Sequence, residues 1–197
     1  MKTKVNQIEQ VIFEHEHLIT LLKQNKEFIS KIEKAVSMLV AAIKNKKKIL
    51  VCGNGGSAAD SQHLAGELVG RFQKEREPIE CISLTTNTSI ITAIGNDYGF
   101  DRIFARQIDA TGKNGDVVIL ISTSGKSTNI IEAAKSARMK KMKIISLTGY
   151  EPNMLSEMSD LTISVPSKST PRIQEMHSII IHLICGILEE TLFSHEK

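Results

Sequence analysis

Apolar residues recur at helical spacing along the first part of the chain, from Val5 to Lys44. Asn25 and Lys26 interrupt this pattern, and asparagine is a favoured residue at the start of a helix. The pattern therefore predicts two amphipathic helices that form an N-terminal extension.

Five short, nearly continuous apolar runs follow this extension, as is typical of strands buried on both faces of a parallel sheet. They cover residues 48–52, 79–84, 117–122, 143–147 and 161–165. Segments with a helical pattern separate or follow these runs, near residues 58–73, 101–111, 128–140 and 171–193. The alternation predicts an α/β fold of three layers (αβα), with a five-stranded parallel sheet between helices. Because 197 residues suit one well-filled core, we expect a single domain over residues 1–197.

The charge and the cysteines narrow the classes of function. The net charge is +3, and the basic clusters at 44–48 and 138–143 contain no aromatic residue, so solvated helix ends and turns explain them better than a nucleic-acid site. Cys52, Cys81 and Cys185 each lie in an apolar run without CxxC spacing. This pattern predicts buried, reduced thiols and a cytosolic location.

Neither a secretion signal nor a membrane span is expected from the sequence. The first residues lack the apolar run of a signal peptide. The apolar run at 179–188 is interrupted by His182 and Gly186. We therefore interpret this run as a core helix of a cytoplasmic protein.

Three polar loops come directly after the first three predicted strands, at residues 53–57, 85–88 and 122–127. Parallel α/β sheets bind ligands at the carboxyl ends of their strands. We therefore expect the chemistry to lie between these loops.

The first loop matches a dinucleotide-binding turn only in part. Gly53, Gly55 and Ala58 fit the pattern G-x-G-x-x-A after a strand. The acidic residue that would hold the ribose is missing, because Thr85 and Thr86 follow the next strand. A Walker P-loop is excluded as well, since no Gly-Lys-Ser/Thr closes the turn.

The same turn is nevertheless suited to an anion. Ser57 is the expected N-cap of the next helix, with Asp60 three residues later as in a capping box. Free amides and the positive end of a helix favour a negative group there. The alternative is a tight turn that needs glycine only for steric reasons.

The third loop carries five hydroxyl side chains and a glycine between a predicted strand and a predicted helix. It reads Ser122-Thr123-Ser124-Gly125-Lys126-Ser127-Thr128. Hydroxyls and free amides that converge in this way predict a phosphate-binding loop without the lysine of a P-loop. A flexible serine-rich connection is the alternative.

Two pairs of polar residues stand at helical spacing. His63 and Glu67 are four residues apart and so share one helix face. Gln174 and His182 are eight residues apart, about 80° around a helix axis, and share a side of the last helix. His182 lies among apolar residues, where it is either a satisfied core histidine or a ligand or proton-transfer group.

The last helix has a clear expected start. Thr170 is the expected N-cap and Pro171 the first helical residue. We assign a structural role to His177, because nothing in the pattern pairs it with the other polar groups.

Four separated segments resemble the sugar-isomerase (SIS) family and, within it, the phosphoheptose isomerases. They are GNGGSAADSQHLAGELVGRF, TAIGNDYGF, ISTSG and RIQEMH with a further histidine, and the similarity extends from about residue 47 to 190. The resemblance implies the SIS fold and a homotetramer whose active sites lie at subunit interfaces, with helices of residues 1–45 packing on the core and in the interface. It also implies conversion of D-sedoheptulose 7-phosphate to D-glycero-D-manno-heptose 7-phosphate, a precursor of ADP- or GDP-heptose.

The resemblance further implies roles for individual residues. Those that match the sugar site are Asn54, Gly55, Gly56, Asn96 and Asp97. Those that match the phosphate site are Ser57, Ser122, Thr123, Ser124 and Ser127. Those that match a zinc site, one per subunit, are His63, Glu67, Gln174 and His182, of which the first three are also expected at the substrate. Glu67 and His182 match the acid–base pair.

An aldose–ketose isomerisation moves one proton between C1 and C2 through an enediol and another between the oxygens. We expect Glu67 to act at carbon and His182 at the oxygens or on the opposite face. Zinc would polarise the carbonyl and stabilise the enediolate. Because a carboxylate held by a metal is a weaker base, the order in which Glu67 serves as ligand and as base stays open.

The chain departs from the family at Lys126, since Gly-Asn-Ser-Pro is common where it has Gly-Lys-Ser-Thr. Lys126 either adds a charge to the phosphate site or points outward. Some SIS proteins of this shape bind the bacterial replication initiator and have no isomerase role, but the presence of both Glu67 and His182 favours an enzyme. A sugar-phosphate-sensing regulator would carry a DNA-binding module, for which 197 residues leave no room.

Overall fold

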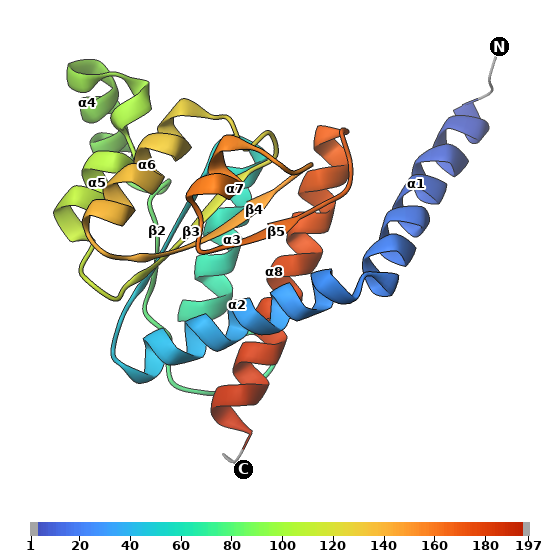
Figure 1. The fold of residues 1–197 in the computed structure, drawn as a ribbon, viewed down its shortest axis with the longest axis horizontal. Coiled ribbons are helices and arrows are strands. Elements are labelled where there is room, and N and C mark those ends of the chain that lie inside the picture. Colours follow the sequence, from blue (N-terminus) through green and yellow to red (C-terminus); the bar gives the residue numbers. More distant parts are fainter. Residues whose placement is uncertain (1–3, 195–197) are drawn as a thin grey trace.

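The computed structural model describes residues 4–194, which form a sheet covered by helices on both faces (Figure 1). The N-terminal extension consists of α1 (Lys4–Gln24) and α2 (Lys26–Lys44), and the side chain of Asn25 caps α2 by accepting from the Phe28 amide. The other elements are β1 (Ile49–Gly53), α3 (Gly56–Val69), β2 (Cys81–Ser83), α4 (Thr88–Tyr98), a 3₁₀ turn (Phe100–Arg102), α5 (Ala105–Thr111), β3 (Val117–Ser122), α6 (Thr128–Met139), β4 (Lys143–Thr148), α7 (Met154–Met158), β5 (Leu161–Ser164) and α8 (Thr170–Phe193).

The five strands are all parallel and follow the order β2-β1-β3-β4-β5. Alternate residues of one strand serve two different cores: in β1, Ile49 and Val51 pack with α2, α3 and α8, while Leu50 and Cys52 pack with α5 and α6. All five residues of β1 are therefore buried. This explains why the strands appear in the sequence as continuous apolar runs, and it confirms the three-layer fold.

The last helix is long and apolar enough to cross a membrane by length and composition alone. In the structure Ile180, Ile181, Ile184 and Leu188 of α8 are buried against the sheet. The helix is thus a core helix, as its interruption by His182 predicts.

Several element boundaries differ from the sequence prediction. Ser57 is not the N-cap of α3: that residue is Gly55 at a φ of +56°, without a side-chain cap. The expected capping box is absent because Ser57 lies inside the helix, and Asp60 accepts a hydrogen bond from Ser178. Likewise Ser169, not Thr170, is the N-cap of α8.

Two helices were missed in the sequence. The helix α7 is a single short turn held by a capping box between Asn153 and Ser156, too short to show a period. In α4 none of the residues is buried, and Ile91 and Ile94 are only partly covered. The segment 101–111, expected as one helix, begins as a 3₁₀ turn and becomes α-helical at Ala105.

The three cysteines are buried free thiols, as predicted. Burial raises the pKa of Cys81 and of Cys185 to about 12. It also raises the pKa of Cys52 far above its ordinary value.

Candidate active site

The candidate site lies where the strand order reverses. The turn after β1 leads into α3 on one face of the sheet, and the loop after β3 leads into α6 on the other. Neighbouring strands whose connections part in this way leave a crevice at their carboxyl ends. Two of the three predicted loops, residues 53–57 and 122–127, border this crevice.

The helices α3 and α8 pack against each other and run in the same direction. Ser178 donates to Asp60 at 2.9 Å, and one turn later His182 lies 3.2 Å from His63. Nearly the same offset along the chain, 118 and 119 residues, therefore joins successive turns of the two helices. This register brings the predicted pair His63 and Glu67 of α3 close to His182 of α8.

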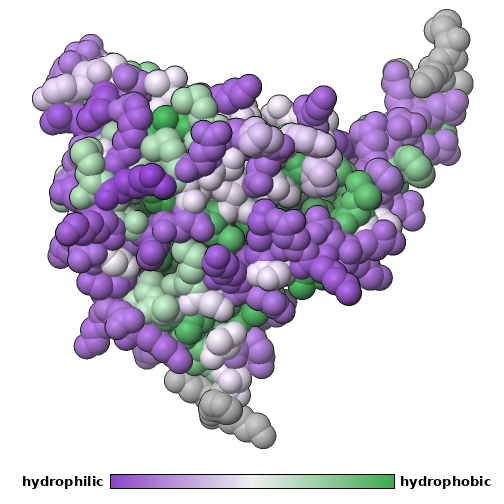
Figure 2. Space-filling view, in the orientation of Figure 1, coloured by the Kyte–Doolittle hydropathy of each residue, from purple (hydrophilic) through white to green (hydrophobic). Residues whose placement is uncertain are grey.

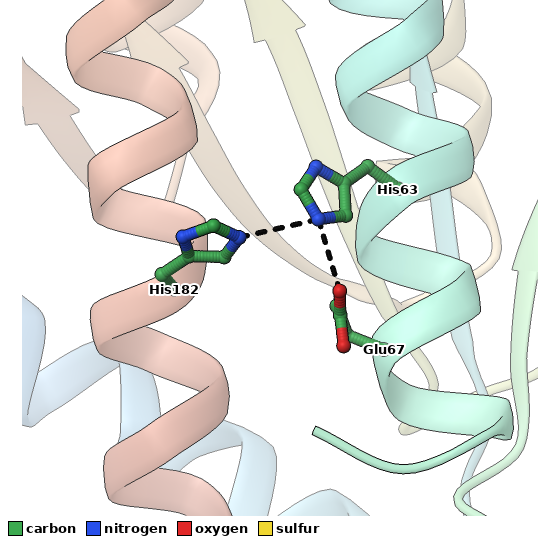
Figure 3. Close-up of side chains that lie close together, drawn as sticks. All are labelled: His63, Glu67 and His182. Carbon is green, nitrogen blue, oxygen red and sulfur yellow. Dashed lines mark hydrogen bonds and ion pairs between the residues drawn. The ribbon is translucent and has the colours of Figure 1, made fainter. Parts of the chain in front are cut away.

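His63, Glu67 and His182 converge on one point between α3 and α8 (Figure 3). The Nε2 atom of His63 lies 3.0 Å from Oε1 of Glu67 and 3.2 Å from Nε2 of His182. All three side chains remain open to solvent or half-buried. The alternative that His182 is a satisfied core histidine is therefore wrong.

The three converging atoms fit a divalent metal. Zinc–nitrogen bonds of about 2.0–2.1 Å in a tetrahedral site place neighbouring ligand atoms about 3.3 Å apart, close to both separations at His63. The Nε2 atom of His63 carries at most one hydrogen, which cannot be aligned with Glu67 and His182 together. A cation between these atoms could be bound by a lone pair from each of the three side chains.

Gln174, the fourth predicted ligand, lies two turns toward the start of α8. Its Nε2 atom is 2.5 Å from the place where a Cβ on Gly56 would stand, so the amide occupies the space that this glycine leaves free. Between this level and the three converging residues lies Asp60, which is 7% exposed and whose Oδ2 has no hydrogen-bond partner. Burial raises the pKa of Asp60, although the hydrogen bond from Ser178 opposes the shift.

The hydroxyl-rich loop is held in shape by its own backbone. The amide of Gly125 donates to Oγ of Ser122, which lies 3.3 Å from Oγ of Ser127, and the amide of Lys126 donates to Oγ of Ser124. Ser124 therefore keeps its hydroxyl hydrogen free to donate outward. Gly125 has a φ of +61° and no room for a Cβ, because Oδ1 of Asn153 would lie 2.1 Å from it.

A cavity of about 520 Å³ adjoins this loop. Its lining residues include Thr123, Ser124 and Lys126 of the loop, together with Lys168. Lys126 therefore faces a cavity next to the predicted phosphate site, which favours the first of its two expected orientations.

At the start of α3 the amides of Ser57 and Ala58 donate to the carbonyl oxygens of Asn54 and Gly55, so it is the positive end of the helix that favours an anion in the crevice. Ser57 is 2% exposed and sits in the first turn of α3. The side chain of Asn54 is engaged by Asn129 of α6 through two hydrogen bonds. Asn129 was not singled out from the sequence, where only its place in the first turn of a helix was visible.

Asn96 and Asp97 are predicted site residues, but within one chain they do not lie beside the other predicted site residues. Both are exposed on α4, where Nδ2 of Asn96 donates to Asp97. The helix α4 lies at the opposite corner of the molecule from α8 (Figure 1).

Two neighbours of the site escaped the sequence analysis. The ring of Phe72 lies 5.4 Å from the ring of His182. Glu189 accepts from the amides of residues 72–74 and from Nε of Arg76, which fixes the segment that carries Phe72. The signal available in the sequence was Glu189, an acidic residue in the apolar pattern of the last helix.

His177 has the structural role expected of it. It is fully buried, and its Nε2 lies 3.1 Å from the carbonyl oxygen of Thr148. Burial lowers its pKa to about 4, so the ring is neutral and donates to that carbonyl.

Comparisons with known proteins agree on one family. A family model described as the SIS domain matches residues 14–149. A phosphoheptose isomerase of Rhodospirillum rubrum is 51% identical over 163 residues, 83% of this chain and 87% of the relative, and one of Aliarcobacter butzleri is 51% identical over 176 residues, 89% and 93%. The solved structure of phosphoheptose isomerase GmhA from Neisseria gonorrhoeae superimposes with a TM-score of 0.90 at 38% identity, covering 95% of this chain and 100% of that one.

Proposed function

The chain belongs to the phosphoheptose isomerase family of SIS-domain proteins and is an isomerase, and we propose that it converts D-sedoheptulose 7-phosphate to D-glycero-D-manno-heptose 7-phosphate for ADP- or GDP-heptose synthesis. The observation that carries the proposal is the convergence of His63 and Glu67 of α3 with His182 of α8. The N-terminus of α3 forms part of the predicted phosphate site, so both sites lie along one helix. Seven residues of α3 separate Gly56 from His63, about 10 Å along the axis, a spacing that suits an extended heptose phosphate.

The phosphate end of the substrate is held by neutral donors. We assign it to the hydroxyls of Ser57, Ser122, Thr123, Ser124 and Ser127. The positive ends of α3 and α6 support a dianion at this place. The sugar hydroxyls are assigned to Asn54, Gly55, Gly56, Asn96 and Asp97.

The reacting end lies between α3 and α8. Glu67 takes the proton from C1 of the ketose and returns it to C2 of the enediol. His182 moves the second proton, which leaves the C1 hydroxyl and is delivered to the C2 oxygen, so that the carbonyl passes from C2 to C1. One positioned acid and one base of this kind supply about 10²–10⁴-fold each.

The residues that would hold zinc are His63, Glu67 and His182, which converge on one point, whereas Gln174, the fourth residue of the predicted set, lies two turns of α8 away from them. Zinc, when bound, polarises the substrate carbonyl and stabilises negative charge that develops on its oxygen. Because a cation lowers the basicity of a carboxylate that it binds, Glu67 accepts the proton only while it is not tightly held.

The proposed assembly is a cytoplasmic homotetramer in which the domain of residues 1–197 uses α1 and α2 at the interfaces. Ile8, Ile12 and Phe13 of α1 are each about 61–62% exposed. Apolar side chains are visible along α1 where it leaves the body of the molecule (Figure 2). A neighbouring chain would cover this surface, and its α4 would supply Asn96 and Asp97 to the site.

The test is turnover of sedoheptulose 7-phosphate, followed by NMR of the aldose product, with and without a chelator. We expect turnover that the chelator suppresses and added zinc restores. Glu80, an exposed acid on the loop before β2, provides the control: Glu80→Gln should leave the rate unchanged. Absence of turnover in wild-type protein supplied with zinc would contradict the proposal and favour the replication-initiator alternative.

A further inference from the structure

Asn54 and Asn129 form a reciprocal pair of amide hydrogen bonds. Nδ2 of Asn54 donates to Oδ1 of Asn129, and Nδ2 of Asn129 donates to Oδ1 of Asn54, both at 2.8 Å. Asn129 is 3% exposed and Asn54 is half-buried. Two bonds made at once by planar groups fix the distance and the angle between their backbones.

The pair joins the starts of two helices. Asn54 directly precedes Gly55, the N-cap of α3, and Asn129 lies in the first turn of α6 after its N-cap Ser127. Each helix directs its positive dipole end toward the crevice. The spacing of these two ends decides whether one anion can contact both.

The pair is not needed to align the strands. The strands β1 and β3 are already in register along their length, up to Gly53 opposite Ile121. Within residues 4–194, no other side-chain hydrogen bond joins the turn 53–57 to the segment 122–129. The amide pair therefore acts on the part of the site that the sheet does not control.

We propose that Asn129 is a positioning residue: through Asn54 it holds the N-termini of α3 and α6 at the spacing at which both bind one phosphate group. The inference rests on the proposed function, because it takes the sugar phosphate as the occupant. It assigns the side chain of Asn54 to the bridge between the helices and leaves its backbone beside the sugar.

The test compares Asn129→Ala, Asn54→Ala and the double variant. Binding of inorganic phosphate is measured by calorimetry, and kcat and KM are measured with sedoheptulose 7-phosphate. Misplacement by about 1 Å can cost about 10²-fold in rate, so we expect each single variant to weaken phosphate binding and raise KM by about 10- to 100-fold, with a smaller change in kcat. The double variant should bind phosphate no more weakly than the weaker single variant, because both changes break the same pair.

The matched control is Asn25→Ala, which removes the cap of α2 and lies in neither of the two loops that border the crevice. It should lower the melting temperature without changing the phosphate dissociation constant. If Asn129→Ala does not fold, Asn54→Ala tests the same pair from its more accessible side.

Unchanged phosphate binding in folded Asn129→Ala, or additive losses in the double variant, would overturn the inference, as would a wild-type protein that binds no phosphate. Weakened phosphate binding in a protein that does not turn over sedoheptulose 7-phosphate would retain the positioning role and reject the proposed function.

Discussion

Replacing Glu189 by glutamine should destabilise the protein strongly while preserving the shape of the side chain. Glu189 is 3% exposed, and its two oxygens accept from three backbone amides of residues 72–74 and from Nε of Arg76, whose side chain is 1% exposed. Arg76 also donates to the carbonyls of Glu67, Leu68 and Gly70 at the end of α3. The substitution leaves this guanidinium buried without its counter-charge and turns one acceptor oxygen into a donor.

Breaking a buried ion pair from one side costs about 3–5 kcal/mol. For a chain of this length about 2–4 °C of melting temperature corresponds to each kcal/mol, so Glu189→Gln should melt about 6–20 °C lower. Circular dichroism during heating and urea unfolding at one protein concentration measures the change, since association would also shift the midpoint.

The adjacent Glu190 provides the control. Its side chain is 64% exposed and is paired with Lys74 at the surface. Glu190→Gln should change the free energy of unfolding by less than about 0.5 kcal/mol. The reasoning is refuted if Glu189→Gln costs as little as Glu190→Gln.

The effect of Glu189 should depend on pH. Burial by itself would raise its pKa, but the hydrogen bonds from residues 72–74 and Arg76 outweigh burial and lower the pKa below the ordinary value of 4.5. A lowered pKa in the folded state means that the stabilisation is fully present above the unfolded value and is lost as the pH falls through the folded value. The difference between wild type and Glu189→Gln should therefore be constant near neutral pH and shrink as the pH falls below the ordinary value of 4.5.

Three further predictions concern the site and the thiols. Glu67→Gln should lower kcat by about 10²–10⁴-fold with the melting temperature nearly unchanged, and a near-normal kcat would remove Glu67 from its role. Ser124→Ala should raise KM by about 10- to 150-fold with little change in kcat, since a hydrogen bond to a charged group is worth about 1.5–3 kcal/mol; an unchanged KM would contradict the phosphate assignment. Cys81 and Cys185, whose pKa values burial raises to about 12, should resist alkylation by iodoacetamide in folded protein at pH 8 and react after denaturation, as mass spectrometry can show.

The sheet was predictable because its strands are buried on both faces. Such burial requires unbroken apolar runs, and runs like Val117–Ser122 are visible without any tertiary knowledge. Helix starts were less predictable, because the chain begins α3 at a glycine in a left-handed conformation, for which the sequence offers Ser57 as a better cap. A Cβ at Gly53 would collide with the backbone of Ser57 and one at Gly56 with the amide of Gln174, so tertiary packing requires glycine at both positions.

The nearness of two site residues was predictable when both lie on one helix, and less predictable when they lie on two different helices. The spacing of His63 and Glu67 placed both on one face of α3, whereas the nearness of His182 depends on how α8 lies against that face. The contacts of Asn129 and Asp60 gave no sequence signal, since their partners Asn54 and Ser178 lie 75 and 118 residues away.

The register between α3 and α8 connects these separate contacts. Gly56 faces Gln174, Asp60 faces Ser178 and His63 faces His182, so the partners stand 118 or 119 residues apart at every level. A constant offset along two parallel helices means that a shift at one level is transmitted to the others, because packed helices move as rigid elements. The contacts of Gly56, Ser178 and His182 are therefore parts of one packing arrangement between α3 and α8. A substitution at Gly56 should disturb the convergence at His63, although about 10 Å of helix separates the two residues.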